Sequence, residues 1–117
     1  MNIVYLKNLY QLYVDQDWLK YGGVPQKEIK SLELRIGFTL PIAYKEFLLI
    51  DGQDCPIMKV GYRFKNVEEI NRQAHDYFKE YDVGLDRDIW VVGESSGSMY
   101  ISFFYLDEGD NPPIYRF

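Results

Sequence analysis

The sequence predicts an α+β fold, in which N-terminal helices pack on a mostly antiparallel sheet with one inserted helix. Apolar residues recur at helical spacing in the first half of the chain. Runs of β-branched and aromatic residues separated by turn-forming residues fill much of the second half, and no alternating strand–helix–strand series is present. The chain of 117 residues has the usual length of one domain, so we expect a single domain over residues 1–117.

Three helices are expected in the first half of the chain. From Ile3 to Val14, apolar residues stand three and four positions apart, which is typical of an amphipathic helix. A second helix is expected from Pro25 to Gly37, and a third from Pro41 to Gly52. Both predictions depend on the same signals, because proline is favoured at the start of a helix and glycine just beyond its end.

The second half is expected to be mainly strands with one helix inserted. The run from Ile57 to Phe64 favours one or two short strands. A fourth helix is expected from Val67 to Tyr81, and Asn66 and Glu69 have the spacing of a capping pair at its start.

A hairpin is expected after this helix. Its strands would be Ile89 to Val92 and Met99 to Leu106, joined by the turn-forming cluster from Gly93 to Ser98. After a second polar turn, Ile114 to Phe117 is expected to return as a further strand.

The segment from Glu33 to Gly52 resembles the signature of the SUKH superfamily. In that signature a glutamate, a glycine, a Leu-Pro pair, a Tyr-Lys pair and a final glycine recur in order, here Glu33, Gly37, Leu40-Pro41, Tyr44-Lys45 and Gly52. The later half resembles the strand, turn, strand and closing strand of the family, here Ile89 to Glu94, Tyr100-Ile101 and Pro112 to Tyr115.

This resemblance implies a protein without catalytic activity. Bacterial members of the superfamily commonly act as immunity proteins that bind and neutralise a cognate toxin such as a secreted nuclease, and fungal relatives act in cell-wall regulation. Many relatives continue beyond the position of Phe117 through a helix that covers the sheet. An uncovered sheet would leave an exposed apolar patch, so a homodimer is kept as an alternative assembly.

Composition narrows the choice of partner and compartment. The net charge of -5 opposes binding to nucleic acid or to an anionic membrane and favours a basic protein, such as a basic toxin domain. The single cysteine excludes an intramolecular disulfide, and no signal sequence or membrane span is visible, so a cytoplasmic protein is expected. We expect no cofactor.

Two patterns suggest a small hydrolase as an alternative. Gly93 to Gly97 matches the G-x-S-x-G pattern around Ser95, but a strand is expected next where that motif requires a helix. Cys55 and His75 have the chemistry of a nucleophile and a base. His75, however, lies on an ordinary amphipathic helix, where a solvated imidazole is expected.

Metal and glycosidase sites have weaker support. A zinc site is not expected from one cysteine and one histidine. Asp15-Gln16-Asp17 and Asp86-Arg87-Asp88 have the D-x-D spacing of calcium loops but lack the later glycine and glutamate. The carboxylate pairs Glu68-Glu69 and Asp107-Glu108 are interpreted as solvated surface.

The preferred hypothesis is an immunity protein whose acidic turns attract a basic toxin. A regulatory adaptor without a toxin partner is the first alternative. The proposed contacts are acidic residues before and around the hairpin, whose charge would raise the association rate: Asp82, Asp86, Asp88, Glu94, Asp107, Glu108 and Asp110.

Overall fold

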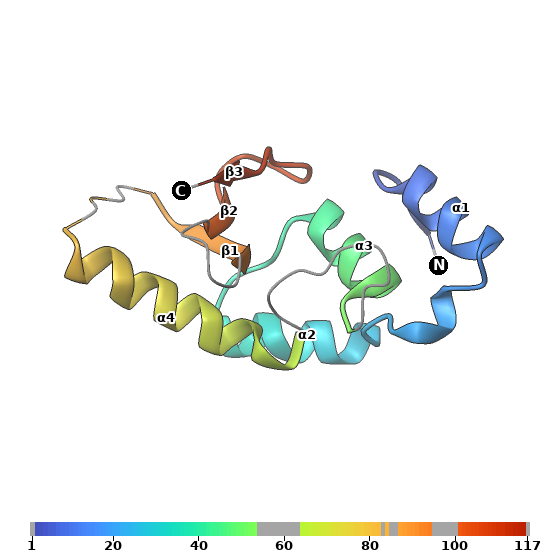
Figure 1. Ribbon diagram of the computed structural model, residues 1–117, viewed down its shortest axis with the longest axis horizontal. Coiled ribbons are helices and arrows are strands. Elements are labelled where there is room, and N and C mark those ends of the chain that lie inside the picture. Colours follow the sequence, from blue (N-terminus) through green and yellow to red (C-terminus); the bar gives the residue numbers. More distant parts are fainter. Residues whose placement is uncertain (1, 54–63, 83, 85–86, 95–100, 117) are drawn as a thin grey trace. The chain divides into compact units, whose positions relative to one another are not determined.

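The fold consists of four α-helices and a three-stranded sheet over the part of the chain that the computed structural model describes, residues 2–53, 64–82, 84, 87–94 and 101–116 (Figure 1). The helices are α1 (Lys7–Asp15), α2 (Gln26–Ile36), α3 (Ile42–Asp51) and α4 (Val67–Glu80), with short 3-10 helices η1 (Leu19–Tyr21) and η2 (Phe64–Asn66). The strands β1 (Ile89–Glu94), β2 (Ile101–Tyr105) and β3 (Tyr115–Arg116) are antiparallel in the order β1-β2-β3. This arrangement confirms the predicted α+β class.

The chain divides into two compact units, residues 1–59 and 60–117. Each unit has its own cluster of buried apolar side chains. The expectation of a single domain over residues 1–117 therefore stays a prediction. Within the described ranges, no helix is long and apolar enough to cross a membrane.

Helix α1 begins at Lys7, four residues later than the apolar spacing predicts. The preceding backbone is held by the buried carboxylate of Glu46 on α3, which accepts the N–H groups of Val4, Tyr5 and Leu6 at 2.7, 2.9 and 3.0 Å. A carboxylate at the start of a helix satisfies donors that have no partner within the helix and favours its dipole. Glu46 thus fixes the N-terminal segment on α3.

Tyr13 is the centre of the buried cluster of the first unit. Its ring packs edge-on against Trp18, with the centroids 5.6 Å apart, and it shares the cluster with Ile3 and Ile50. Its hydroxyl donates to Asp51 Oδ2 at 2.6 Å, so a buried polar group has the partner that burial requires. The three hydrogen bonds to Glu46 and the one to Asp51 therefore all end on buried carboxylates of α3.

Helices α2 and α3, which were predicted from proline and glycine at their ends, match their predicted bounds within one residue. Pro25 and Pro41 stand immediately before the first helical residues, and Gly37 ends α2 in the left-handed conformation with φ 82°. Leu34, however, is 84% exposed and does not share the buried face of Ile29 and Leu32. The apolar pattern of α2 thus predicted the helix correctly but overstated how much of it is buried.

Two charged residues of the resemblance segment, Glu33 and Lys45, bind each other. Glu33 Oε2 on α2 accepts the N–H of Leu40 at 2.7 Å and lies 3.4 Å from Lys45 Nζ on α3. The side chains of Glu33 and Lys45 are 16% and 28% exposed. Glu33 therefore joins Leu40, in the connection between α2 and α3, to Lys45 in the first turn of α3.

Two glycines allow the chain to pass closely against the end of α3. A Cβ atom on Gly23 would stand 2.0 Å from the carbonyl oxygen of Leu49, and one on Gly52 would stand 2.6 Å from Val24 Cγ2. The contact is held by Val24 N–H, which donates to the Leu48 carbonyl at 2.8 Å. A side chain at either glycine position would force the backbone apart.

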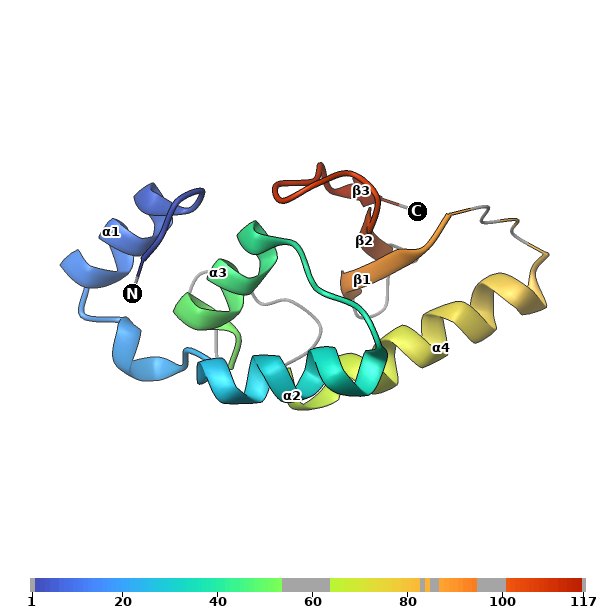
Figure 2. The same ribbon diagram turned by 180° about the vertical axis from the view of Figure 1, so that it is seen from behind.

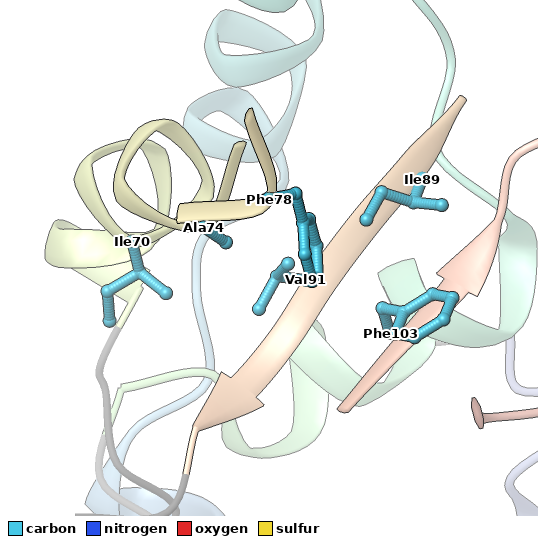
Figure 3. Packing of buried hydrophobic residues seen from close by; sticks show 6 residues of the cluster. All are labelled: Ile70, Ala74, Phe78, Ile89, Val91 and Phe103. Carbon is cyan, nitrogen blue, oxygen red and sulfur yellow. The ribbon is translucent and has the colours of Figure 1, made fainter. Parts of the chain in front are cut away.

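In the second unit, α4 covers one face of β1. Ile70, Ala74 and Phe78 point from α4 toward Val91, and Ile89 and Phe103 complete the buried cluster (Figure 3). These positions on α4 are three and four residues apart, as the helical spacing predicts. The predicted capping pair is wrong: the start of α4 has no side-chain cap, and Glu69 binds Arg72 and Gln73 instead.

Asn71 links α4 to the outer edge of β1. Its Oδ1 accepts the N–H of Val91 at 2.7 Å, and its Nδ2 donates to the Val91 carbonyl at 3.1 Å and to the Val67 carbonyl at 3.0 Å. The amide therefore pairs with Val91 as a neighbouring strand would. Among the described strands β1 lies at the edge of the sheet. Edge strands present unpaired backbone groups to other chains, and Asn71 binds one such pair on β1.

The hairpin and the closing strand confirm the strand predictions within two residues. The register of β1 and β2 shifts between Val91 and Gly93, which is a β-bulge. Ile89, Val91 and Phe103 of these two strands are buried in the cluster with α4, whereas an uncovered apolar sheet face and the homodimer that it would favour stay predictions. Of the strands expected between Ile57 and Phe64, positions 57–63 lie outside the described residues, and Phe64 belongs to η2.

Candidate protein-binding surface

The acidic residues chosen from the sequence do not lie at one place. Asp88 stands at the beginning of β1, and its carbonyl accepts the N–H of Leu106 at 3.0 Å, just beyond the end of β2. Figure 2 shows the turn that leads from β2 to β3, and Asp107, Glu108 and Asp110 belong to this turn in the sequence. Four of the seven therefore gather at one end of the hairpin.

The remaining three are separate from this end. Asp82 is exposed just after α4, with φ 54°. Glu94 is the last residue of β1, and its backbone pairs with Ile101 at the opposite end of the hairpin. The Glu94 side chain and Asp86 lie outside the described residues.

Arg87 organises the acidic end of the hairpin. Its Nη2 and Nε donate to the two oxygens of Asp107 at 2.7 and 3.0 Å, and Nη2 lies 3.1 Å from Glu108 Oε1. Its guanidinium carbon stands 3.8 Å from the ring centroid of Tyr105, the distance of a cation–π contact. One cation thus binds two of the acidic residues that we proposed as partner contacts.

A row of aromatic rings supports this arrangement. The ring of Tyr115 on β3 lies 5.8 Å from that of Phe103 and 5.1 Å from that of Tyr105, both on β2. The Tyr115 hydroxyl donates to Glu108 Oε2 at 3.1 Å. Arg87, Tyr105, Asp107, Glu108 and Tyr115 form what we call the Arg87 cluster.

The titration of these groups follows from their contacts. Hydrogen bonds from Arg87 lower the pKa of Asp107, and the same hydrogen bonds raise the pKa of Arg87. The hydrogen bond to Glu108, followed by partial burial, raises the pKa of Tyr115. Asp107 and Arg87 are therefore both charged across the physiological range, and Tyr115 is a neutral donor.

The Arg87 cluster has the composition of a protein-binding surface. Tyrosine and arginine are enriched among the residues that contribute most to protein–protein binding. The side chains of Arg87, Asp107 and Glu108 are 40%, 60% and 24% exposed, and Tyr115 is 37% exposed. With two carboxylates to one guanidinium, the cluster carries a net negative charge, and Asp88 and Asp110 add to it.

Sequence reasoning missed Arg87 and Asn71. Arg87 was considered only as the middle of a D-x-D pattern, although a cation between two aspartates at the start of a strand can reach the turn beside it. Asn71 was overlooked as a polar residue at helical spacing from Val67 and Ala74, on the buried face of α4. A polar residue on the apolar face of a helix indicates that its side chain is buried and hydrogen-bonded to another group.

The structure does not bring the residues considered for a hydrolase together among the residues that it describes. Ser95 and Cys55 lie outside the described residues. His75 is exposed on α4, and its Nδ1 bonds to the Asn71 carbonyl at 2.7 Å, as expected for an ordinary helical histidine. The described residues contain no group of three His, Cys, Asp or Glu side chains placed to hold a metal ion.

Two of the four pairs considered for calcium and glycosidase chemistry, Asp15 with Asp17 and Asp107 with Glu108, have other partners. Asp17 pairs with Lys20 and Asp15 accepts from Gln11, so the first D-x-D pattern does not converge on one point. Asp107 and Glu108 both bind Arg87.

Comparison with known proteins identifies a family. The model of the SMI1 / KNR4 family (SUKH-1) matches residues 23–117, which confirms the resemblance read from the sequence. The match runs through both compact units and leaves out α1 and η1. Neither the curated proteins nor the solved structures give a match.

Proposed function

The chain belongs to the SMI1/KNR4 family (SUKH-1), and from this membership we propose that it is a non-catalytic protein-binding domain, an immunity protein that neutralises a cognate bacterial toxin by direct binding. The family match over residues 23–117 is the observation that carries the proposal. A nuclease is the kind of toxin that fits best, because a protein that binds nucleic acid presents clustered basic residues to phosphate.

Charge supports a basic partner. The chain has a net charge of -5, and four acidic residues gather at one end of the hairpin. Complementary charge steers two proteins together and raises the association rate more than the final affinity. The rings of Tyr105 and Tyr115, which belong with Asp107 and Glu108 to the Arg87 cluster, would supply contacts that hold the complex.

Co-expression with the product of the neighbouring open reading frame tests the proposal. A stable complex that survives purification, together with restored growth of cells that produce the toxin, is the expected result. The association rate should fall as salt is added, since the steering charges are exposed. No complex and no restored growth would reject the proposal.

Two other outcomes identify the alternatives. A stable complex with a protein that is not toxic indicates a regulatory adaptor. Covalent labelling of Ser95 by a fluorophosphonate, or of Cys55 by a thiol reagent, with loss of a hydrolytic activity on substitution by alanine, would indicate a small hydrolase. Under the proposed function, no hydrolytic activity depends on either residue.

A further inference from the structure

The side chain of Arg87 occupies a site with the features of guanidinium recognition. Asp107 accepts two parallel hydrogen bonds, at 2.7 and 3.0 Å, and Glu108 lies at 3.1 Å from the same Nη2 atom. The ring of Tyr105 faces the guanidinium carbon at 3.8 Å. A planar fork on a carboxylate with an aromatic ring below it is specific to arginine, because the point charge of lysine cannot make the paired bonds.

The backbone, the tyrosine rings and Glu108 beside Arg87 are held by contacts that do not involve it. Asp107 and Glu108 are the second and third residues beyond the end of β2, whose register is fixed by pairing with β1 and β3. The rings of Tyr105 and Tyr115 pack at 5.1 Å, and the Tyr115 hydroxyl binds Glu108. The site would therefore keep its shape if another guanidinium took the place of Arg87.

Replacement of Arg87 by such a group is energetically accessible. The side chains of Arg87 and Asp107 are 40% and 60% exposed, and exposed ion pairs change an equilibrium constant by less than about fivefold. Without Arg87, the end of the hairpin would hold Asp88, Asp107, Glu108 and Asp110 without the guanidinium that binds two of them. An incoming arginine would meet both the geometry and the charge that suit it.

We propose that Tyr105, Asp107, Glu108 and Tyr115 form an arginine-recognition site, which Arg87 fills in the free chain and an arginine side chain of the protein partner fills in the complex. The identity of the occupant rests on the proposed function, whereas the site itself does not. Charge complementarity at this end of the hairpin selects a basic side chain, and the bidentate geometry selects arginine over lysine.

The first experiment needs no partner. Guanidinium chloride is titrated into the Arg87→Ala variant up to about 0.2 M, because so weak a contact saturates only well above the millimolar range, and this stays below the molar range in which guanidinium unfolds proteins. Saturable shifts of the Tyr105 and Tyr115 ring resonances toward their wild-type positions are expected, and ammonium chloride at equal concentration should not produce them. The double variant Arg87→Ala, Asp107→Asn should lose the response. Arg87→Gln replaces the alanine variant if that variant unfolds.

The second experiment uses the partner captured by co-expression. Arg87→Ala removes the internal competitor and is expected to raise the affinity of the complex by about two- to fivefold, whereas Asp107→Asn and Glu108→Gln lower it by about three- to tenfold. Asp82→Asn, which removes the same charge away from the cluster, is the matched control and should have a smaller effect.

The outcomes separate the site from the function. No saturable guanidinium response in a folded variant overturns the site. A response with equal ammonium binding overturns its selectivity for arginine, and a normal response with unchanged partner affinity in all three variants overturns the exchange. If no partner is found, the proposed function fails while the guanidinium titration still decides the site.

Discussion

The α2–α3 segment and the Arg87 cluster each contain an ion pair, Glu33 with Lys45 and Asp107 with Arg87. Comparing the two pairs distinguishes residues that stabilise the fold from residues that are available to a partner. Glu33 binds a backbone N–H group as well as Lys45, and both side chains are largely buried. Asp107 binds Arg87 through side-chain atoms, and both are largely exposed. A largely buried pair whose carboxylate also binds a backbone N–H group stabilises the fold, whereas a pair between exposed side chains remains available to solvent and to other molecules.

This difference explains what the family signature encodes. Gly37 supplies the left-handed end of α2, Gly52 allows the close approach of Val24, and Glu33 joins Leu40 to Lys45. Each role lies inside the first unit. The signature therefore identifies the fold, and a partner is better sought at residues that the signature does not include, such as Arg87 and Tyr115.

The largest effect is expected where the scaffold tolerates no extra atom. In Gly23→Ala the new Cβ would stand 2.0 Å from the Leu49 carbonyl oxygen, so the backbone must move. The variant should lose about 3 kcal/mol or more of unfolding free energy in a urea titration. Gly84→Ala is the control, because a Cβ there meets no described atom within 4 Å. Equal stability of the two variants would contradict the close approach at Gly23.

Asn71→Ala tests the hydrogen bonds that join α4 to β1 in the second unit. The substitution leaves the N–H and the carbonyl of Val91 without the amide that pairs with them, and a loss of about 2–4 kcal/mol in unfolding free energy is expected. Gln73→Ala on the exposed side of the same helix should have little effect. Hydrogen exchange of the Val91 amide should also accelerate in Asn71→Ala, and an unchanged exchange rate would contradict this role of Asn71.

Glu33→Gln compares the two carboxylate pairs directly. The amide keeps the size of the side chain but loses the charge that binds Lys45 and strengthens the bond from the Leu40 N–H, so a loss of about 1–2 kcal/mol is expected. Asp107→Asn makes the same change in the exposed pair and should leave the urea midpoint nearly unchanged. A larger effect at Asp107 than at Glu33 would reverse the assignment of scaffold and surface.

The sequence allowed the elements to be predicted better than their connections. Helical spacing and proline–glycine punctuation are local, and they placed α2, α3 and α4 within one residue of their observed bounds. Glu46, Asn71 and Arg87 act over 40, 20 and 20 positions. No local pattern states which distant backbone group or carboxylate such a side chain will meet. The late start of α1 has this cause, because Glu46 binds residues that the spacing alone assigned to the helix.

The candidate site shows the same limit. The turn-forming residues after β2 correctly predicted that Asp107, Glu108 and Asp110 lie in one turn. Their charge, however, led us to expect carboxylates without an ion-pair partner, whereas Asp107 and Glu108 bind Arg87. The strand pairing of Ile89 with Tyr105 brings the residues that flank the hairpin together, and Arg87 reaches Asp107 only through that pairing. The register of a hairpin is set by the whole sheet, so the ion pair follows from the fold and could not be read from spacing.

The smallest expected effect concerns the hydroxyl of Tyr115. Its hydrogen bond to Glu108 stabilises the neutral form, which raises the pKa of Tyr115 above the ordinary value of 10.0. Its contribution to stability is therefore present below pH 10 and is lost as the pH rises through the folded-state value. Glu108→Gln should lower the pKa of Tyr115, as followed by NMR of its ring, whereas Asp110→Asn removes a charge from the same turn and should have a smaller effect. Equal shifts in both variants would mean that general charge, and not the bond to Glu108, sets this titration, and Glu108 would then be no fixed part of the Arg87 cluster.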